Sequence, residues 1–292
     1  GYDVVYMNVS TAISFICAKA AKTEGVKKRI VHAHSSGYES TNPLRRRIII
    51  TLNYIFKPII FHLATDYWAC SKPAAIWVFS ARALKAATYK VIPNAIDIKR
   101  FAFHAAMRDE KRKEFGLQNH LVIGHVGRFI HVKNHRFIID VFHALHQLHK
   151  ESKLMLVGDG ELMEDIRARV SALNLDDDVI FLGQRNDIPD LLQAMDAFVF
   201  PSFFEGFGYA ALEAEATGLK CFLSKAVPSE VDMTGNCFFL DIKSKDAPEN
   251  WAKTILENAL HYERKDRTQD IIDHGYGLGE IDFYNILFGD LG

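Results

Sequence analysis

Short apolar runs alternate with longer segments in which apolar residues recur every three or four positions. Such short runs are typical of buried strands, and the longer period is typical of helices that cover a sheet. The runs predict strands at residues 4–7, 29–33, 67–70, 89–92, 121–126, 153–157, 179–182, 197–200, 219–223 and 237–240. The longer segments predict helices at residues 11–23, 44–63, 135–149, 162–173, 208–217 and 249–262. This alternation indicates an α/β protein with mainly parallel sheets.

A charge-dense segment separates the predicted strands into two groups. Residues 108–114 read as a polar helix that Gly116 ends, and a segment of this kind suits a domain boundary. We therefore predict a first domain at residues 1–105, a second at 106–275, and a tail at 276–292 that crosses back to the first. The first strand starts at the very N-terminus, so we expect the first domain to be an incomplete doubly wound domain.

Composition excludes several classes of protein. The 35 Lys and Arg against 36 Asp and Glu lack the basic excess of a nucleic-acid binder. The four cysteines form no C-x-x-C pair and read as free thiols of a reducing compartment, and no signal-peptide pattern opens the chain, so a cytoplasmic location is expected. The longest apolar stretch, residues 48–63, is interrupted by Asn53, Lys57 and Pro58 and predicts no membrane-spanning helix.

The segment 201–214 carries two glutamates on a predicted strand–loop–helix unit. Its loop contains Gly206, and a helix begins near Gly208, where unpaired backbone N–H groups favour an anion. Carboxylates suit sugar hydroxyls rather than phosphate, so Glu205 and Glu213 indicate a site for a sugar that carries phosphate. An ordinary turn with solvated glutamates is the alternative, and the residues alone leave it open.

The segment 123–134 places two basic residues at the end of another predicted strand. Gly127 is followed by Arg128, whose guanidinium forks onto phosphate oxygens, and Lys133 adds a compact charge. Together they can neutralise a diphosphate leaving group, so neither a metal ion nor a cofactor is expected. Taken alone, the pair also fits two charges that merely solvate a loop.

Five motifs in this order resemble a known family. They are VIPNAID (91–97), GHVGRFIHVKN (124–134), LMLVGDGEL (154–162), VIFLGQRNDI (179–188) and EGFGYAALEA (205–214). The chain resembles the retaining glycosyltransferases of the GT-B fold and E-x7-E type, glycosyl transferases group 1, that build capsular and other exopolysaccharides. The resemblance implies two Rossmann-like domains with a cleft between them.

The resemblance also implies a role for each matching residue. Arg128 and Lys133, beside Gly127, hold the donor diphosphate, and Glu205 contacts the transferred sugar as a positioning group. His34, but not His32, faces that sugar. The remaining roles are the ribose hydroxyls for Glu213, backbone contacts for Gly206, Phe207 and Gly208, and the base for Gln184 and Arg185.

The function that follows is sugar transfer with retained anomeric configuration. The expected donor is a nucleotide-diphosphate sugar, with UDP as the nucleotide, and the acceptor is a saccharide or a lipid-linked saccharide. We expect the opening strand and glycine-rich loop of the family to be absent from this sequence, so an inactive nucleotide-sugar-binding module is the alternative. Ala95 stands where the family often has Gly, a mild change that stiffens the turn between the domains. A dehydrogenase is disfavoured because no G-x-G-x-x-G follows a strand, and the E-x7-E loop disfavours an epimerase.

The predicted helix at 44–63 has two open interpretations. Its start is basic, residues 48, 52, 55, 59 and 63 are apolar, and Arg46, Asn53 and Lys57 lie on another side. The apolar face packs on its own sheet in the first interpretation, which we favour. In the second, the helix rests on an anionic membrane, as basic amphipathic helices do.

Overall fold

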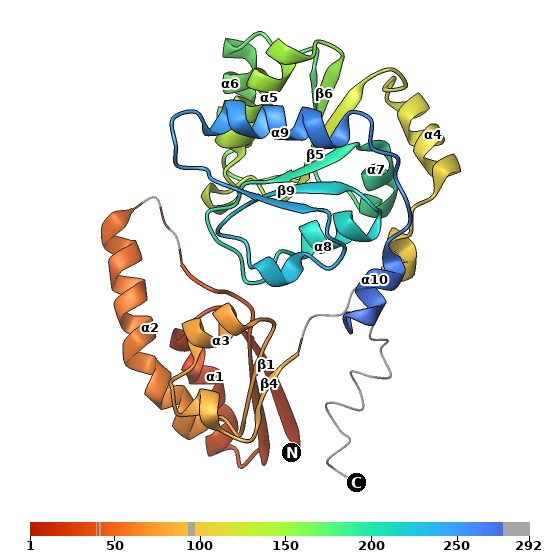
Figure 1. Cartoon of the computed structure of the whole chain (residues 1–292). Helices are drawn as coiled ribbons and strands as arrows, with labels where there is room; N and C mark the ends of the chain where they lie inside the picture. Colours follow the sequence, from red (N-terminus) through yellow and green to blue (C-terminus); the bar gives the residue numbers. More distant parts are fainter. Residues whose placement is uncertain (39, 41, 93–96, 277–292) are drawn as a thin grey trace. The chain divides into compact units, whose positions relative to one another are not determined.

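The computed structural model describes residues 1–38, 40, 42–92 and 97–276. It divides the chain into two compact units, Gly1–Asn94 with Phe204–Phe207, and Ala95–Phe203 with Gly208–Gly292. Each unit has a parallel sheet with helices packed against it, which confirms the predicted α/β class (Figure 1). The position of Ala95 and the tail at 277–292 lie outside the described residues.

The first unit is built on a four-stranded sheet. Its strands are β1 (Val4–Val9), β2 (Lys28–Ala33), β3 (Asp66–Ala69) and β4 (Tyr89–Val91), paired in that order. Its helices are η1 (Ala12–Ser14), α1 (Phe15–Thr23), α2 (Pro43–Leu63), α3 (Lys72–Val78) and η2 (Ala83–Lys85). All three pairings are parallel, and Ile30, Val31 and Trp68 are fully buried in the sheet, as apolar runs predict for strands covered on both faces.

The second unit has a six-stranded sheet with a reversal in its strand order. The strands are β5 (Leu121–Val126), β6 (Ser152–Val157), β7 (Val179–Phe181), β8 (Ala197–Phe200), β9 (Lys220–Ser224) and β10 (Cys237–Leu240), in the order β10-β9-β8-β5-β6-β7. The chain therefore builds outward from β5 in one direction and from β8 in the other. In open parallel sheets, ligands bind outside the carboxyl ends of the strands at such a switch point.

Helices cover both faces of this sheet. They are η3 (Ile98–Phe101), α4 (Ala105–Glu114), η4 (His131–Lys133), α5 (His135–Leu148), α6 (Met163–Ala172), α7 (Ile188–Ala194), α8 (Tyr209–Ala216), η5 (Ser229–Val231), α9 (Ala247–Ala259) and α10 (Thr268–Asp273). Figure 1 shows α5 and α9 together on one face and α8 on the other. The core on the first face includes Phe142 and Trp251, which are almost completely buried.

Three arginines donate hydrogen bonds to the backbone carbonyls at the end of α7. The charge-dense segment forms α4, as predicted, but its arginines do not simply solvate a surface. Arg108 Nη1 donates to the carbonyls of Gln193 (3.0 Å) and Met195 (2.8 Å), and Arg112 Nη1 donates to that of Ala194 (2.8 Å). Arg264 Nη1 reaches the same two carbonyls as Arg108, at 2.9 and 3.0 Å, and burial lowers the pKa of Arg264 to about 9. The last carbonyls of α7, which no helical partner satisfies, are thus capped by cations.

The orientation of α2 corrects the favoured interpretation of its pattern. Asn53 is fully buried: its Oδ1 accepts from Ala12 N and its Nδ2 donates to Trp77 O, both at 2.7 Å. Lys57 Nζ donates to Ile76 O, also at 2.7 Å. Ile48 and Ile55 remain 49% and 57% exposed, so the expectation that this apolar face packs on its own sheet is wrong. The polar side faces inward because two neighbouring segments offer it backbone partners.

Replacing Asn53 tests this inverted packing. Asn53→Ala leaves a buried N–H and a buried carbonyl without partners, so we expect the free energy of unfolding to fall by about 1–3 kcal/mol. Urea denaturation followed by tryptophan fluorescence measures the change. The control is Thr51→Ala, which alters an exposed position of the same helix and is expected to change stability by less than about 0.5 kcal/mol. Equal effects of the two changes contradict the buried role of Asn53.

Candidate functional site

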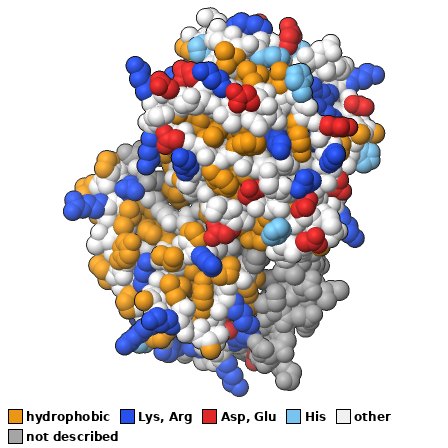
Figure 2. All heavy atoms as spheres, viewed as in Figure 1, with side chains coloured by type: hydrophobic (Ala, Val, Ile, Leu, Met, Phe, Trp, Pro, Cys, Tyr) orange, Lys and Arg blue, Asp and Glu red, His pale blue; other side chains and the backbone are white. Residues whose placement is uncertain are grey.

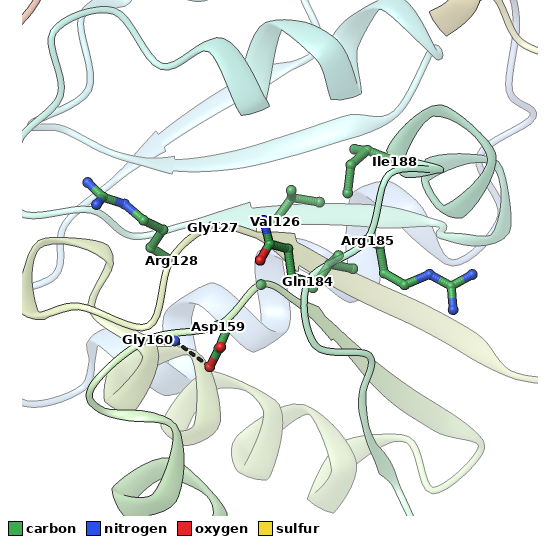
Figure 3. A pocket seen from close by; sticks show the side chains of 10 residues that line it. Val126, Gly127, Arg128, Asp159, Gly160, Gln184, Arg185 and Ile188 are labelled. Atoms are coloured by element: carbon green, nitrogen blue, oxygen red, sulfur yellow. Dashed lines mark hydrogen bonds between the residues drawn. The ribbon is translucent and has the colours of Figure 1, made fainter.

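A pocket of about 420 Å³ lies at the carboxyl ends of β5, β6 and β7, beside the switch point of the second sheet (Figure 3). The three turns that follow these strands supply its walls. The lining residues are Val126, Gly127, Arg128, Val157, Gly158, Asp159, Gly160, Gln184, Arg185 and Ile188. The pocket therefore contains four of the site residues predicted from the sequence, and the sheet topology explains why they meet.

The turns after β5 and β6 touch at a place with no room for a side chain. Gly158 has a φ of +134°, and a Cβ atom there would overlap the carbonyl oxygen of Gly127. A Cβ on Gly127 would in turn lie 2.7 Å from His125 Nε2. Gly158, Asp159 and Gly160 were not among the predicted site residues. The signal was present, because a G-x-G that follows a strand marks close backbone approach.

Arg128 and Lys133 occupy different surroundings in this unit. Arg128 is exposed, and its guanidinium makes no hydrogen bond or ion pair with any residue the structure describes. Lys133, which is half-buried, has its ammonium 4.6 Å from the centre of the Phe200 ring, and its Cδ would lie 3.5 Å from a Cβ on Gly127. The lysine does not line the pocket, but its stem lies against the turn that does.

The start of α8 lies close to the same phenylalanine. Gly208 is the N-cap of α8 with a φ of +104°, a conformation that favours glycine, and a Cβ on it would lie 3.6 Å from Phe200 Cε1. The Phe200 ring is therefore close both to the Lys133 ammonium and to the first turn of the helix. Glu213, further along α8, is half-buried, and burial raises the pKa of its carboxyl to about 7. The carboxylate of Glu213 makes no hydrogen bond or ion pair with any residue that the structure describes.

Gln184 and Arg185 belong to the turn after β7. Figure 3 shows the Arg185 side chain directed away from Arg128. Arg185 donates from Nε and Nη2 to the two carboxylate oxygens of Asp187, at 2.8 and 2.6 Å, and this pairing holds the pKa of Asp187 at about 2. Gln184 is exposed, so its amide is available to a ligand at the pocket.

Two neutral histidines, His125 and His135, are buried against the turn after β5 that lines the pocket. His125 is completely buried, and its Nδ1 donates to Val199 O at 2.8 Å. The His135 ring is edge-on to it at 4.8 Å and stacks on Phe129 at 4.0 Å. Burial, reinforced by the charge of Lys133, lowers the pKa of His135 to about 3, and burial lowers that of His125 well below its usual value. Both rings are therefore uncharged near neutrality.

The other predicted site residues belong to the first unit. His34 follows β2, and its Nε2 lies 2.7 Å from Asn8 Oδ1, which only accepts, so Nε2 carries the proton. The Ser36 and Ser71 hydroxyls donate to the carbonyls of Glu205 and Gly206. A Cβ on Gly206 would overlap the His34 carbonyl. His34 is therefore adjacent to the segment Glu205–Phe207, in which Phe207 is 1% exposed.

His32, to which sequence analysis gave no role, lies directly beside His34. The two ring centres are 4.1 Å apart, and Tyr6 Oη is hydrogen-bonded to His32 Nδ1. Burial lowers the pKa of His32 to about 3, with a smaller contribution from His34. Burial also lowers the pKa of His34. The pair thus remains neutral at physiological pH.

The family model of glycosyl transferases group 1 matches residues 107–269, which is more than half of the chain. The match covers the strand-end turns, the pocket and α8. The chain belongs to this family, as its motifs predicted.

Two curated relatives extend the similarity into the first unit. The putative glycosyltransferase EpsF of Bacillus subtilis is 31% identical over 259 residues, which cover 88% of this chain and 66% of EpsF. The UDP-Gal:alpha-D-GlcNAc-diphosphoundecaprenol alpha-1,3-galactosyltransferase of Escherichia coli is 33% identical over 231 residues, covering 76% of this chain and 58% of that enzyme. The chain thus spans 66% of the length of the first relative and 58% of the length of the second, less than two thirds in both cases.

Solved structures share the fold at lower sequence identity. Anabaena HepE in complex with UDP and glucose is 23% identical and superposes with a TM-score of 0.71 over 95% of this chain and 78% of HepE. The sucrose-phosphate synthase of Thermosynechococcus elongatus is 20% identical, with a TM-score of 0.77 over 99% of this chain and 75% of the synthase. The predicted GT-B fold is confirmed by these neighbours.

The buried histidines predict how the stability of the second unit depends on pH. The folded-state pKa of His135 is below its unfolded value, so the stabilisation from the neutral ring is complete above about pH 6.5 and is lost as the pH falls toward 3. We expect His135→Phe, which retains the stacking on Phe129, to reduce the stability lost between pH 7.5 and pH 5 by about 1–2 kcal/mol. Urea denaturation at the two pH values measures the difference. His261→Phe, at an exposed histidine, is the control, and a loss as large as that of the parent in His135→Phe contradicts the assignment.

Proposed function

We propose that the chain transfers a sugar from a nucleotide-diphosphate sugar to a saccharide or lipid-linked acceptor, with UDP as the nucleotide and the anomeric configuration retained. The observation that carries this proposal is the pocket at the switch point of the second sheet. Arg128 lines it beside Gly127, and its exposed guanidinium has no ion-pair partner among the described residues. An exposed arginine at the carboxyl end of a parallel sheet suits an anionic ligand. The family to which the chain belongs supports a phosphorylated sugar as that ligand.

The chemistry assigns the donor diphosphate to Arg128, Lys133 and the start of α8. Departure of the nucleotide develops negative charge on the diphosphate, and preorganised cations and N–H groups stabilise that charge. Lys133 is preorganised because its stem packs beside Gly127 and its ammonium lies over Phe200. With this charge stabilised by cations and N–H groups, no general acid is needed at the leaving group.

The remaining residues position the sugar and the nucleoside. Glu213 accepts the ribose hydroxyls, and a half-buried carboxylate gains most from such charge-assisted bonds. Gln184 and Arg185 border the base, with Arg185 contributing through its backbone because its guanidinium is held by Asp187. Glu205 and His34 hold the transferred sugar, with backbone contacts from Gly206, Phe207 and Gly208.

The curated relatives support the choice of donor and acceptor. The name of the Escherichia coli enzyme specifies a UDP-linked donor and an acceptor attached to diphosphoundecaprenol. A donor of the UDP class and a lipid-linked saccharide acceptor are therefore the first substrates to test. The resemblance to capsular and exopolysaccharide enzymes suggests the same biological role here, in the cytoplasm.

Lys133→Ala tests the donor assignment. We expect calorimetry to show a loss of affinity for UDP-sugars of about 100-fold, because a partly buried charge partner of the diphosphate is removed. The control is Lys150→Ala, at an exposed lysine of the same unit that should leave affinity unchanged. Release of UDP from a panel of UDP-sugars, with and without acceptor, then measures transfer. Normal donor affinity in Lys133→Ala contradicts the assignment, and binding without UDP release above background identifies a nucleotide-sugar-binding module instead.

The outer face of α2 supports a peripheral contact with a membrane. Leu44, Ile48 and Ile55 are 69%, 49% and 57% exposed, and Arg45–Arg47 are exposed at the start of the same helix. Figure 2 shows hydrophobic side chains gathered on the first unit with basic groups among them. No helix among the residues described is long and apolar enough to cross a bilayer. An apolar stripe with a basic start suits the headgroup region of an anionic leaflet, where lipid-linked acceptors reside.

Liposome flotation tests the membrane contact. We expect the parent chain to float with vesicles that contain anionic lipid, and Arg45, Arg46 and Arg47 changed together to Glu to abolish flotation at low salt. Ile48→Ser with Ile55→Ser removes apolar area and should weaken flotation as well. Leu148→Ser, at a residue of the second unit that is 54% exposed, should have no effect. Unchanged flotation of the triple Glu variant rules the basic patch out.

A further inference from the structure

Three potential metal ligands meet in the second unit, away from the residues considered so far. They are Glu215 in the last turn of α8, Asp232 just after η5, and Cys237 at the start of β10. One carboxylate oxygen from each acid and the cysteine sulfur lie within 4.8 Å of one another. The donors come from three separate segments, so the fold, rather than local sequence, brings them together.

Glu215 is a buried carboxylate with one oxygen unused. Its side chain is completely inaccessible, and Oε2 accepts from Met233 N (3.1 Å), Thr234 N (3.1 Å) and Thr234 Oγ1 (2.7 Å). Oε1 is equally buried and accepts no hydrogen bond from an N–H or O–H group of the described residues, although the Cys237 thiol lies near enough to the carboxylate to interact with it. A buried carboxylate oxygen without a partner is costly, because water cannot replace the missing interaction. The three bonds to Oε2 fix the carboxylate and leave Oε1 as the oxygen for a further ligand.

The potential metal ligands of this cluster carry more negative charge than the neighbouring cations balance. Asp232 Oδ1 accepts from Gly235 N at 2.9 Å, which leaves Oδ2 for another contact. Two cations are nearby, and both have other partners: Lys220 donates to Asn236 Oδ1 at 2.7 Å and lies over the Tyr262 ring at 4.5 Å, and Arg267 donates to Asp270 Oδ2 and Thr234 O, both at 2.6 Å. They balance part of the charge of the cluster through space.

The pocket lies at the carboxyl ends of the strands of the second sheet, and the cluster lies at their amino ends. The pocket borders the carboxyl ends of β5, β6 and β7, whereas Cys237 is the first residue of β10 in the same parallel sheet. Helix α8 runs back between these ends, because it follows β8 and precedes β9. Its first turn is thus near the pocket side and its last turn, with Glu215, near the cluster.

We propose that Glu215, Asp232 and Cys237 bind one divalent cation of the zinc class. A thiolate with two carboxylates is a borderline-soft donor set that suits Zn²⁺ or Co²⁺ better than Mg²⁺ or Ca²⁺, and three protein ligands leave a fourth position for water. Cys237 releases its proton on binding, so the cation replaces that proton and neutralises the buried carboxylate. The ion ties the last turn of α8 to β10 and to the loop of Asp232, and its role is structural.

Cobalt binding by the full chain tests the proposal. After treatment with a chelator, one equivalent of Co²⁺ should produce thiolate-to-metal charge-transfer absorption, and Zn²⁺ should displace it. Cys237→Ser should abolish this absorption, and Cys17→Ser, at an exposed cysteine of the first unit, should preserve it. Glu215→Gln keeps the size and one acceptor of the side chain, and we expect at least about a 10-fold loss of affinity, the loss that even indirect partners of a metal produce.

Each outcome decides for or against the site. Absence of charge-transfer absorption in the parent chain, or absorption that persists in Cys237→Ser, overturns the proposal. Because Co²⁺ absorption needs no donor sugar, the result is independent of whether the chain transfers sugar. Thermal unfolding with and without Zn²⁺ gives a second readout, since a cation that binds only the folded chain should raise the Tm of the parent but not that of Glu215→Gln.

Discussion

The second unit depends on backbone contact between the turns after β5 and β6. Because Gly158 has no side chain, the carbonyl of Gly127 lies against it, and the two turns together form one wall of the pocket. Any side chain at Gly158 would separate them and move Arg128, which follows Gly127 directly. The position of Arg128 thus depends on the missing side chain at Gly158 and on the neutral histidines His125 and His135 packed against the turn.

Neutrality beneath the pocket has an electrostatic consequence. His125 and His135 are buried near Lys133, and a charged imidazole there would add repulsion to the cost of desolvation. Keeping both rings uncharged leaves the positive charge on side chains that can reach a ligand. The fold therefore concentrates its positive charge at the surface of the pocket rather than within its support.

The polar core of the first unit follows a different principle. Asn53 and Lys57 are buried because Trp77 and Ile76 offer carbonyls at the right place, and each such bond prevents a costly unpaired group. Once these two residues face inward, the geometry of the helix turns Ile48 and Ile55 outward. The exposed apolar stripe is therefore the result of specific hydrogen bonds rather than of a weak hydrophobic pattern.

Most strands could be predicted because a buried strand shows up as a short run of apolar residues in the sequence. β5, β8 and β10 begin and end at the predicted residues, since each is a mainly apolar run between turn residues. α3 and α7 were missed because each has only seven residues, too few for a helical period to be visible. The proline in the first turn of each was the available signal.

The site was predictable to the extent that residues follow strand ends. Gly127, Arg128, Gln184 and Arg185 line one pocket because parallel strands deliver their carboxyl ends to one edge. The inward turn of α2 was not predictable, because the carbonyls that hold it belong to α3, far along the chain. Glu215 looked like an ordinary helical glutamate for the same reason, since Thr234 and Cys237 reach it only in the folded sheet.

The arginines around α7 give the second unit an architectural property. Arg108 lies near the place where the chain enters this unit, and Arg264 lies after its last core helix, α9. Both donate to the carbonyls of Gln193 and Met195, so α4 and the segment after α9 are held at the same place. The end of α7 thus links the part of the unit that precedes its sheet to the part that follows its sheet.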